Sequence, residues 1–159
     1  MNQQTELTVL KTVTVAADQQ RAFDVYTKGF GTWWPKEHHI ADVEMATCTF
    51  EPHEGGRWFE TGVDGSECEW GRVLVWDPPN RLVHTWQLQG DWRHDPDPAR
   101  GSEVEVRFIA EGPNTTRVEL EHRHFERHGD GADSVRDGVS SPKGYDYCLA
   151  GYVAAVRAA

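Results

Sequence analysis

The chain has 159 residues, of which 38% are hydrophobic and 26% charged, a balance typical of a globular protein and not of a disordered one. Its 16 Lys and Arg against 26 Asp and Glu give a net charge of −10, which makes nucleic acid and anionic membranes poor partners. No apolar run is long enough to span a bilayer, and the N-terminus has no secretory-signal pattern. The length predicts a single domain over residues 1–159.

The N-terminal part predicts one strand followed by helices. Residues 7–15 alternate in the way of a half-buried strand. Asp18 is expected to cap a helix that Gly29 and Gly31 end, and the segment 33–35 opens a second short turn or helix.

The middle of the chain predicts antiparallel strands joined mostly by hairpins. Turn residues at 63–66 and 77–80 and a polar loop at 90–101 separate several of them. The expected strands cover residues 44–51, 57–61, 67–76, 81–88, 102–110 and 117–125.

The C-terminal part predicts a long amphipathic helix that begins near Pro142. One apolar stripe is formed by Tyr145, Cys148, Leu149, Tyr152, Val153 and Val156. Strands with helices at both ends favour an α+β fold, in which a curved antiparallel sheet of six or seven strands wraps around this helix. A curved sheet cannot close fully on a straight helix, so a cavity is expected between them.

Three segments resemble a known family: FGTWWP at 30–35, EPHEGGRW at 51–58 and WGRVLVWDPPNRL at 70–82. Together with the order of elements, they resemble the START-like (SRPBCC), or helix-grip, superfamily. Within it, they are similar to the bacterial branch named after the C-terminal domain of the activator of the heat-shock ATPase chaperone. The resemblance runs from about Leu7 to the last helix. It implies a cavity between sheet and helix for apolar or aromatic small molecules, and some members are polyketide aromatase/cyclases.

The expected ligand-binding residues are those that alternation and the helix stripe turn toward this cavity. Arg72 and the histidines are the expected polar contacts, and the aromatic residues the walls. Alternatively, Arg72 pairs with Glu60 or Glu67, and the histidines bond to backbone or water. The predicted set is Trp33, Trp70, Arg72, Trp76, His84, Trp86, Phe108, His122, Leu149 and Tyr152.

No catalytic residue, cofactor or metal is predicted. His84, His122 and His124 could form a three-ligand metal site, but chance makes such histidine pairs common. The serines lie in turns, loops and caps, so no nucleophile elbow is evident. A reactive thiol at Cys68, with Arg72 as the nearby cation, stays open as an alternative.

The sequence therefore predicts a cytoplasmic protein that binds a small hydrophobic or aromatic ligand. Three widely spaced cysteines, Cys48, Cys68 and Cys148, suit a reducing compartment. One alternative is an enzyme of the polyketide cyclase or hydrolase type, with His84 or His122 as acid–base group and Arg72 holding an anion. Another is a chaperone-associated interaction module, although the chaperone activator engages its partner through a separate domain that is not expected here. A homodimer and a lid role for residues 126–144 stay open.

Overall fold

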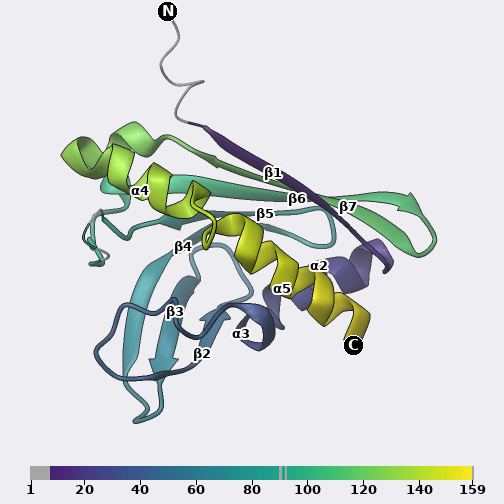
Figure 1. Ribbon diagram of the computed structural model, residues 1–159, viewed down its shortest axis with the longest axis horizontal. Helices are drawn as coiled ribbons and strands as arrows, with labels where there is room; N and C mark the ends of the chain where they lie inside the picture. The colour runs from purple at the N-terminus through teal and green to yellow at the C-terminus, as the bar shows by residue number, and fades with distance from the viewer. Residues whose placement is uncertain (1–7, 90, 92, 159) are drawn as a thin grey trace, which may run out of the picture.

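Seven antiparallel strands form one curved sheet in the order β1-β7-β6-β5-β4-β3-β2 (Figure 1). The computed structural model describes residues 8–89, 91 and 93–158; Leu7, where the first strand was expected to begin, and part of the 90–101 loop lie outside them. The expected α+β class and antiparallel sheet are confirmed. The strands are β1 (Val9–Val15), β2 (Met45–Phe50), β3 (Arg57–Gly62), β4 (Glu67–Asp77), β5 (Arg81–Trp86), β6 (Ser102–Gly112) and β7 (Thr115–Arg123).

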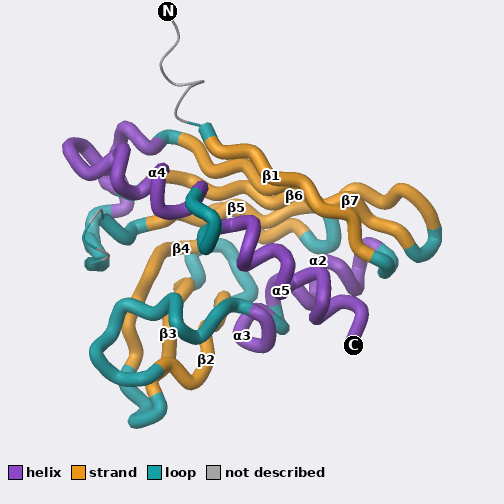
Figure 2. The backbone as a smooth tube through the Cα atoms, in the orientation of Figure 1, coloured by secondary structure: helices purple, strands orange, loops and turns teal. Residues whose placement is uncertain are grey.

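The C-terminal helix crosses the inner side of the sheet, and the remaining helices lie near the two ends of this helix (Figures 1 and 2). It packs against β1 and against the two helices that follow β1. The helical segments are α2 (Gln19–Thr27), α3 (Phe30–Trp33), η1 (Pro98–Arg100), η2 (Phe125–Gly131), α4 (Ala132–Ser140) and α5 (Tyr145–Ala158).

The helix boundaries follow local chemistry. Asp18 caps α2 as expected, because its Oδ1 accepts a 2.8 Å hydrogen bond from the backbone N–H of Arg21. The last helix begins at Tyr145 instead of Pro142, since Ser141–Gly144 forms a turn closed by a 2.8 Å backbone bond from Gly144. The buried residues of α5 fall on the expected apolar stripe.

Strand β4 departs twice from simple alternation. Trp58 pairs with Gly71 while Phe59 pairs with Glu69, so Trp70 is an extra residue on β4. A second irregularity lies between Val73 and Val75, opposite β5. Each bulge moves the residues beyond it to the other face of the sheet.

Aromatic side chains fill the space between the sheet and most of α5. Tyr26 contacts Trp33, Phe108 and Tyr152, with ring centroids 5.1, 5.7 and 5.3 Å apart. Trp58 contacts Trp70 at 5.0 Å. The inner side of the sheet is therefore packed over much of its length, and a larger open space lies where this packing ends.

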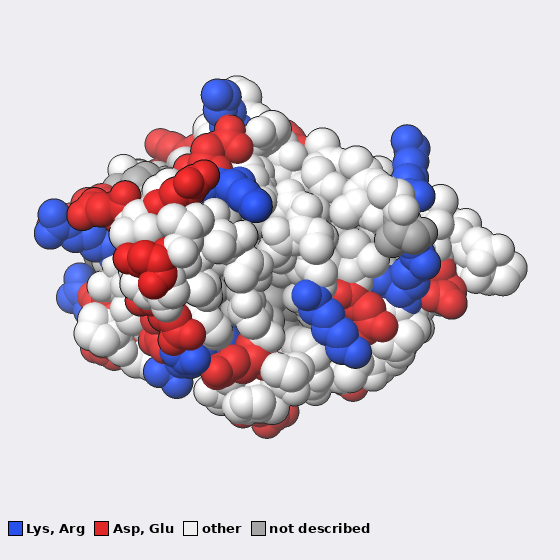
Figure 3. All heavy atoms as spheres, turned by 90° about the horizontal axis from the view of Figure 1, so that it is seen from below, with Lys and Arg blue, Asp and Glu red and all other residues white. Residues whose placement is uncertain are grey.

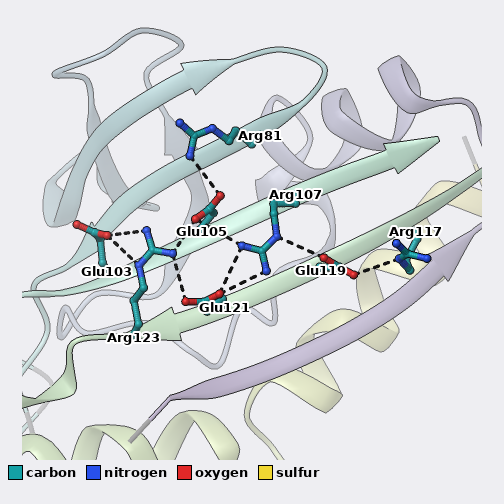
Figure 4. A network of polar contacts seen from close by, with 8 residues as sticks. All are labelled: Arg81, Glu103, Glu105, Arg107, Arg117, Glu119, Glu121 and Arg123. Atoms are coloured by element: carbon teal, nitrogen blue, oxygen red, sulfur yellow. Dashed lines mark hydrogen bonds and ion pairs between the residues drawn. The ribbon is translucent and has the colours of Figure 1, made fainter. Parts of the chain in front are cut away.

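The outer face of β5, β6 and β7 carries a network of arginines and glutamates (Figure 4). Arg123 is central to it, with its guanidinium 2.7 Å from Glu103 and 2.6 Å from Glu105. Arg107 contacts Glu119 and Glu121 beside it. Charged groups on this outer face leave the apolar face of the sheet for the core.

Among the described residues, no helix is long and apolar enough to cross a membrane. On the face drawn in Figure 3, basic side chains lie among acidic ones and do not gather into a basic patch. That distribution agrees with the net charge of −10.

Candidate functional site

A cavity of about 360 Å³ lies where the aromatic packing ends, near the start of α5. Three segments enclose it: the stretch after α3, the inner faces of β4 and β5, and the connection from α4 into α5. Its lining consists of Trp34, Glu37, His38, His39, Ile40, Trp70, Trp86, Leu88, Gly138, Val139, Ser141, Lys143, Gly144, Tyr145 and Cys148.

The most buried walls of the cavity are aromatic. Trp34, Trp70 and Trp86 each contribute an indole, and Tyr145 contributes a phenol from the first turn of α5. All four residues are at least nine-tenths buried. Flat, apolar surfaces of this kind favour stacking with aromatic rings.

A buried carboxylate fixes two parts of this wall. Glu60 on β3 is fully buried, and its Oε1 accepts hydrogen bonds from Trp70 Nε1 at 2.9 Å and from the backbone N–H of Ile40 at 2.6 Å. His39 Nδ1 lies 4.0 Å from the other carboxylate oxygen. Glu60 therefore joins the segment after α3 to the indole of Trp70.

Polar contacts hold the segment after α3 against the α4–α5 connection. His38 Nε2 lies 2.8 Å from the backbone oxygen of Lys143, and Trp34 Nε1 donates to the backbone oxygen of His38 at 3.2 Å. The hydroxyl of Tyr147 on α5 lies 3.3 Å from Glu37. The bonds of His38 and Tyr147 are exposed, so the segment closes the cavity partly with contacts that water can replace.

A chain of buried hydrogen bonds begins at Tyr145 and leads away from the cavity. The Tyr145 hydroxyl is 2.8 Å from His122 Nδ1. Ser102 Oγ lies between the Nε2 atoms of His122, at 2.6 Å, and His128, at 2.7 Å. His128 Nδ1 is 3.1 Å from Gln89 Oε1. We call these five side chains the buried polar chain.

Burial sets the protonation of the groups in and beside this chain. It lowers the pKa of His122 well below the ordinary value of 6.5 and that of His128 to about 4. Both rings are therefore neutral near pH 7. Burial also raises the pKa of the Tyr145 hydroxyl well above its ordinary value, and that of Cys148 to about 12. A phenol and a thiol, both uncharged, thus line the cavity.

The structure brings two of the predicted ligand-binding residues, Trp70 and Trp86, to the cavity. Others belong to the packed core. His84 contacts Trp58 at 4.4 Å, its Nδ1 is 3.0 Å from the backbone oxygen of Thr85, and it borders only a void of about 10 Å³. His122 does not line the cavity, but its Nδ1 lies 2.8 Å from the hydroxyl of Tyr145, which is a lining residue. The remaining core members of the predicted set are Trp33, Phe108, Leu149 and Tyr152, and Trp76 is partly buried and packs against them.

The expectation that Arg72 faces inward is wrong. Trp70 and Arg72 would share a face by simple alternation, but the bulge at Trp70 and Gly71 turns Arg72 outward. Its guanidinium pairs with Glu69 at 3.0 Å and is 44% exposed. The alternative, an ion pair with a glutamate of a neighbouring strand such as Glu60 or Glu67, is right in the kind of contact but wrong in the partner, because Glu69 lies on β4 itself.

The alternation of residues in the strands could not predict most of the cavity lining, because most lining residues come from segments without regular periodicity. Residues 34–40 and 138–144 contribute much of the lining and lie in turns or at helix ends. Residues 126–144, for which the sequence left a lid role open, overlap the second of these. For residues 34–40, the signal available in the sequence was the doublet Trp33-Trp34. Trp33 packs in the core, whereas Trp34 lines the cavity.

The described residues contain no group of three or more His, Cys, Asp or Glu placed to hold a metal ion. His124, which was weighed as a ligand beside His122, follows the end of β7 in a left-handed conformation with φ of 64°. It faces Glu126 at 3.5 Å. The imidazoles of His122 and His124 therefore do not face a common metal position.

A curved antiparallel sheet around a C-terminal helix, with a cavity between them, defines a START-like ligand-binding fold. Residues 16–141 match the family model described as activator of Hsp90 ATPase homolog 1-like protein. The chain belongs to this family, as its sequence predicts. None of the curated proteins compared with it matches.

Solved structures give two similar proteins with more than 30% identity. The anthrahydroquino-gamma-pyrone synthase Txn09, solved as a complex, is 42% identical, with 93% of this chain and 96% of that one covered and a TM-score of 0.66. The self-sacrificing resistance protein CalC from Micromonospora echinospora is 36% identical, with 95% and 94% covered and a TM-score of 0.71. Protein NE0264 from Nitrosomonas europaea, at 14% identity, 97% and 96% coverage and a TM-score of 0.67, shows the fold alone.

Proposed function

We propose that this protein binds a hydrophobic or aromatic small molecule in the cavity beside α5. The observation that carries the proposal is a space of about 360 Å³ walled by Trp34, Trp70, Trp86 and Tyr145. Small-molecule sites typically have volumes of about 300–1,000 Å³, with apolar walls and a few polar groups.

The charges at the cavity support a largely uncharged ligand. Lys143 and Glu37 are the lysine and the glutamate of the lining, and both come from the surface segments that close it. The deeper walls carry indoles and the neutral phenol of Tyr145. An isolated charge deep in the cavity would lose hydration without a matching partner.

The relative with 42% identity supports an aromatic ligand. The name of Txn09 describes a synthase of an anthrahydroquino-gamma-pyrone, which is an aromatic compound. The same name favours a second candidate function, an enzyme acting on the bound aromatic molecule. In that case the acid–base groups at the cavity would be Tyr145, His38 or His39, because His84 and His122 do not line it.

The described surface offers little support for a chaperone-associated module. The outer face of β5–β7 is occupied by paired charges (Figure 4). The exposed large hydrophobic residues lie in separate parts of the chain, on β1, in the turn after β3, on β4 and on α5: Leu10, Val63, Leu74 and Tyr147. A location in the cytoplasm is part of the proposal and is supported by the three free cysteines.

Titration with 2-naphthol, followed by tryptophan fluorescence, tests the proposal. Three indoles line the cavity, so a saturable change is expected. Val139→Phe adds bulk to the cavity wall and should abolish this change, whereas Ser140→Phe on the exposed side of α4 should retain it. Equal binding by both folded variants, or no binding by the wild type up to the solubility limit, would overturn the proposed site.

A further inference from the structure

The buried polar chain has a direction that can be derived from its ends. Gln89 Nε2 lies 3.1 Å from the backbone oxygen of Arg100, which can only accept, so the amide NH₂ faces that oxygen. The carbonyl Oε1 of Gln89 therefore faces His128 Nδ1, at 3.1 Å. His128 Nδ1 must carry a proton and donate it.

The next two bonds follow from this assignment. A neutral His128 with a proton on Nδ1 has a bare Nε2, which must accept from Ser102 Oγ at 2.7 Å. The Ser102 hydroxyl has then used its proton and can only accept from His122 Nε2, at 2.6 Å. The backbone N–H of Ser102, 3.3 Å from His128 Nε2, adds a second donor to the same atom.

His122 is neutral, so a proton on its Nε2 leaves Nδ1 bare. Nδ1 lies 2.8 Å from the Tyr145 hydroxyl and must accept its proton. The Tyr145 hydroxyl thus donates away from the cavity, toward the sheet. Among the described residues, no donor is recorded to the lone pairs that remain on its oxygen.

We propose that Tyr145 Oη accepts a hydrogen bond from the bound molecule, so that the cavity selects aromatic compounds with an un-ionised hydroxyl group. This inference rests on the proposed function and names the ligand class of the same site. Tyr145 lines the cavity together with three indoles. The proposal places the hydroxyl of a flat ring stacked there against the phenol oxygen. A ligand carbonyl or phenolate at this point would meet lone pairs with no proton between them.

The tautomers of two histidines test the direction of the chain in the unmodified protein. Ring ¹⁵N chemical shifts at pH 7 should show His122 protonated on Nε2 and His128 protonated on Nδ1. A proton on His122 Nδ1 would overturn the inference, because Tyr145 would then accept from His122 and be free to donate to the ligand. This measurement needs neither a variant nor a ligand.

Affinity for two matched probes tests the selectivity. The wild type should bind 2-naphthol roughly three- to tenfold more tightly than 2-methoxynaphthalene, the ratio expected for one neutral hydrogen bond. Tyr145→Phe should lose this preference. Tyr152→Phe should keep it, because Tyr152 is on the same helix but does not line the cavity, and its hydroxyl donates to the backbone oxygen of Ala22 at 2.7 Å.

The outcomes separate the inference from the proposed function. Failure of both probes to bind the wild type would overturn the proposed function, and the inference with it. Equal affinity for both probes in the wild type, or an unchanged preference in Tyr145→Phe, would overturn the inference alone. If Tyr145→Phe does not fold, the tautomers and the wild-type preference still decide.

Discussion

The carboxylate of Glu60 accepts a 2.9 Å hydrogen bond from the indole of Trp70, and both side chains are almost completely buried. The same oxygen accepts from the backbone of Ile40 at 2.6 Å. One side chain on β3 therefore orients both a wall of the cavity and the segment that closes it. This relationship makes Glu60 a positioning residue of the candidate site, although it does not line the cavity.

Replacing Glu60 should separate the roles of its shape and its charge. Glu60→Leu should lower the free energy of unfolding by about 3 kcal/mol, because two buried donors lose their acceptor. Glu60→Gln should cost about 1 kcal/mol or less, since its amide oxygen can still accept both bonds. Urea unfolding of both variants measures the difference. Equal losses would mean that the charge, facing His39 at 4.0 Å, is what the fold requires.

Arg72 should contribute little to either stability or binding. Its ion pair with Glu69 is partly exposed, and exposed pairs contribute about 0–1 kcal/mol. Arg72→Ala should therefore shift the free energy of unfolding by about 0.5 kcal/mol or less and leave the affinity for 2-naphthol unchanged. Urea unfolding and fluorescence titration measure the two quantities. A clear loss of affinity for 2-naphthol would show that Arg72 contributes to the cavity after all.

The sheet and the last helix were predictable from the sequence because their periodicity is long and regular. The stripe from Tyr145 to Val156 identifies the buried face of α5 without any knowledge of the strands. The position of the cavity was not predictable in the same way. It depends on how completely Phe108, Tyr152 and their aromatic neighbours fill the space between sheet and helix, and side-chain packing of this kind is not visible in a pattern.

The error at Arg72 has a local cause. A bulge inserts one residue into β4 and reverses the facing of those that follow, and the sequence marks it only by Gly71. The buried histidines show the opposite case. Their inward direction was predicted correctly for His84 and His122, but their partners come from distant parts of the chain, such as Tyr145.

The stability of the protein should fall in acid partly because of His84. Burial lowers its pKa from 6.5 to about 4, so the native ring stays neutral while the unfolded chain binds a proton below about pH 6.5. The unfolded state then holds more protons, and stability decreases as the pH falls from 6.5 to 4. The full effect is on the order of 3 kcal/mol.

Urea unfolding at pH 7.5 and 4.5 measures this contribution. His84→Gln removes the titrating group and should reduce the loss of stability between the two pH values. His53→Gln at an exposed position should leave that loss unchanged. If His84→Gln and the wild type lose the same free energy, another group causes the acid sensitivity.

Gly71 should be the residue that permits the bulge in β4. A Cβ atom at this position would collide with the backbone oxygen of Thr85 on the neighbouring strand, and a backbone atom within a sheet cannot move aside easily. The N–H of the next residue, Arg72, also bonds to Thr85 Oγ1 at 2.8 Å, which keeps the two strands close. Gly71→Ala is therefore expected to lower the free energy of unfolding by about 2–4 kcal/mol, within the range for steric overpacking and strain.

Gly112→Ala supplies the matched control, because the nearest atom to a Cβ at that position is 3.9 Å away. It should change the free energy of unfolding by less than about 1 kcal/mol. Since Trp70 precedes Gly71 and lines the cavity, Gly71→Ala should also weaken 2-naphthol binding, whereas Gly112→Ala should not. Urea unfolding and fluorescence titration of the two variants give both readouts. If the two alanine variants were equally stable, β4 could accommodate a side chain at its bulge, and Gly71 would not explain why Arg72 faces outward.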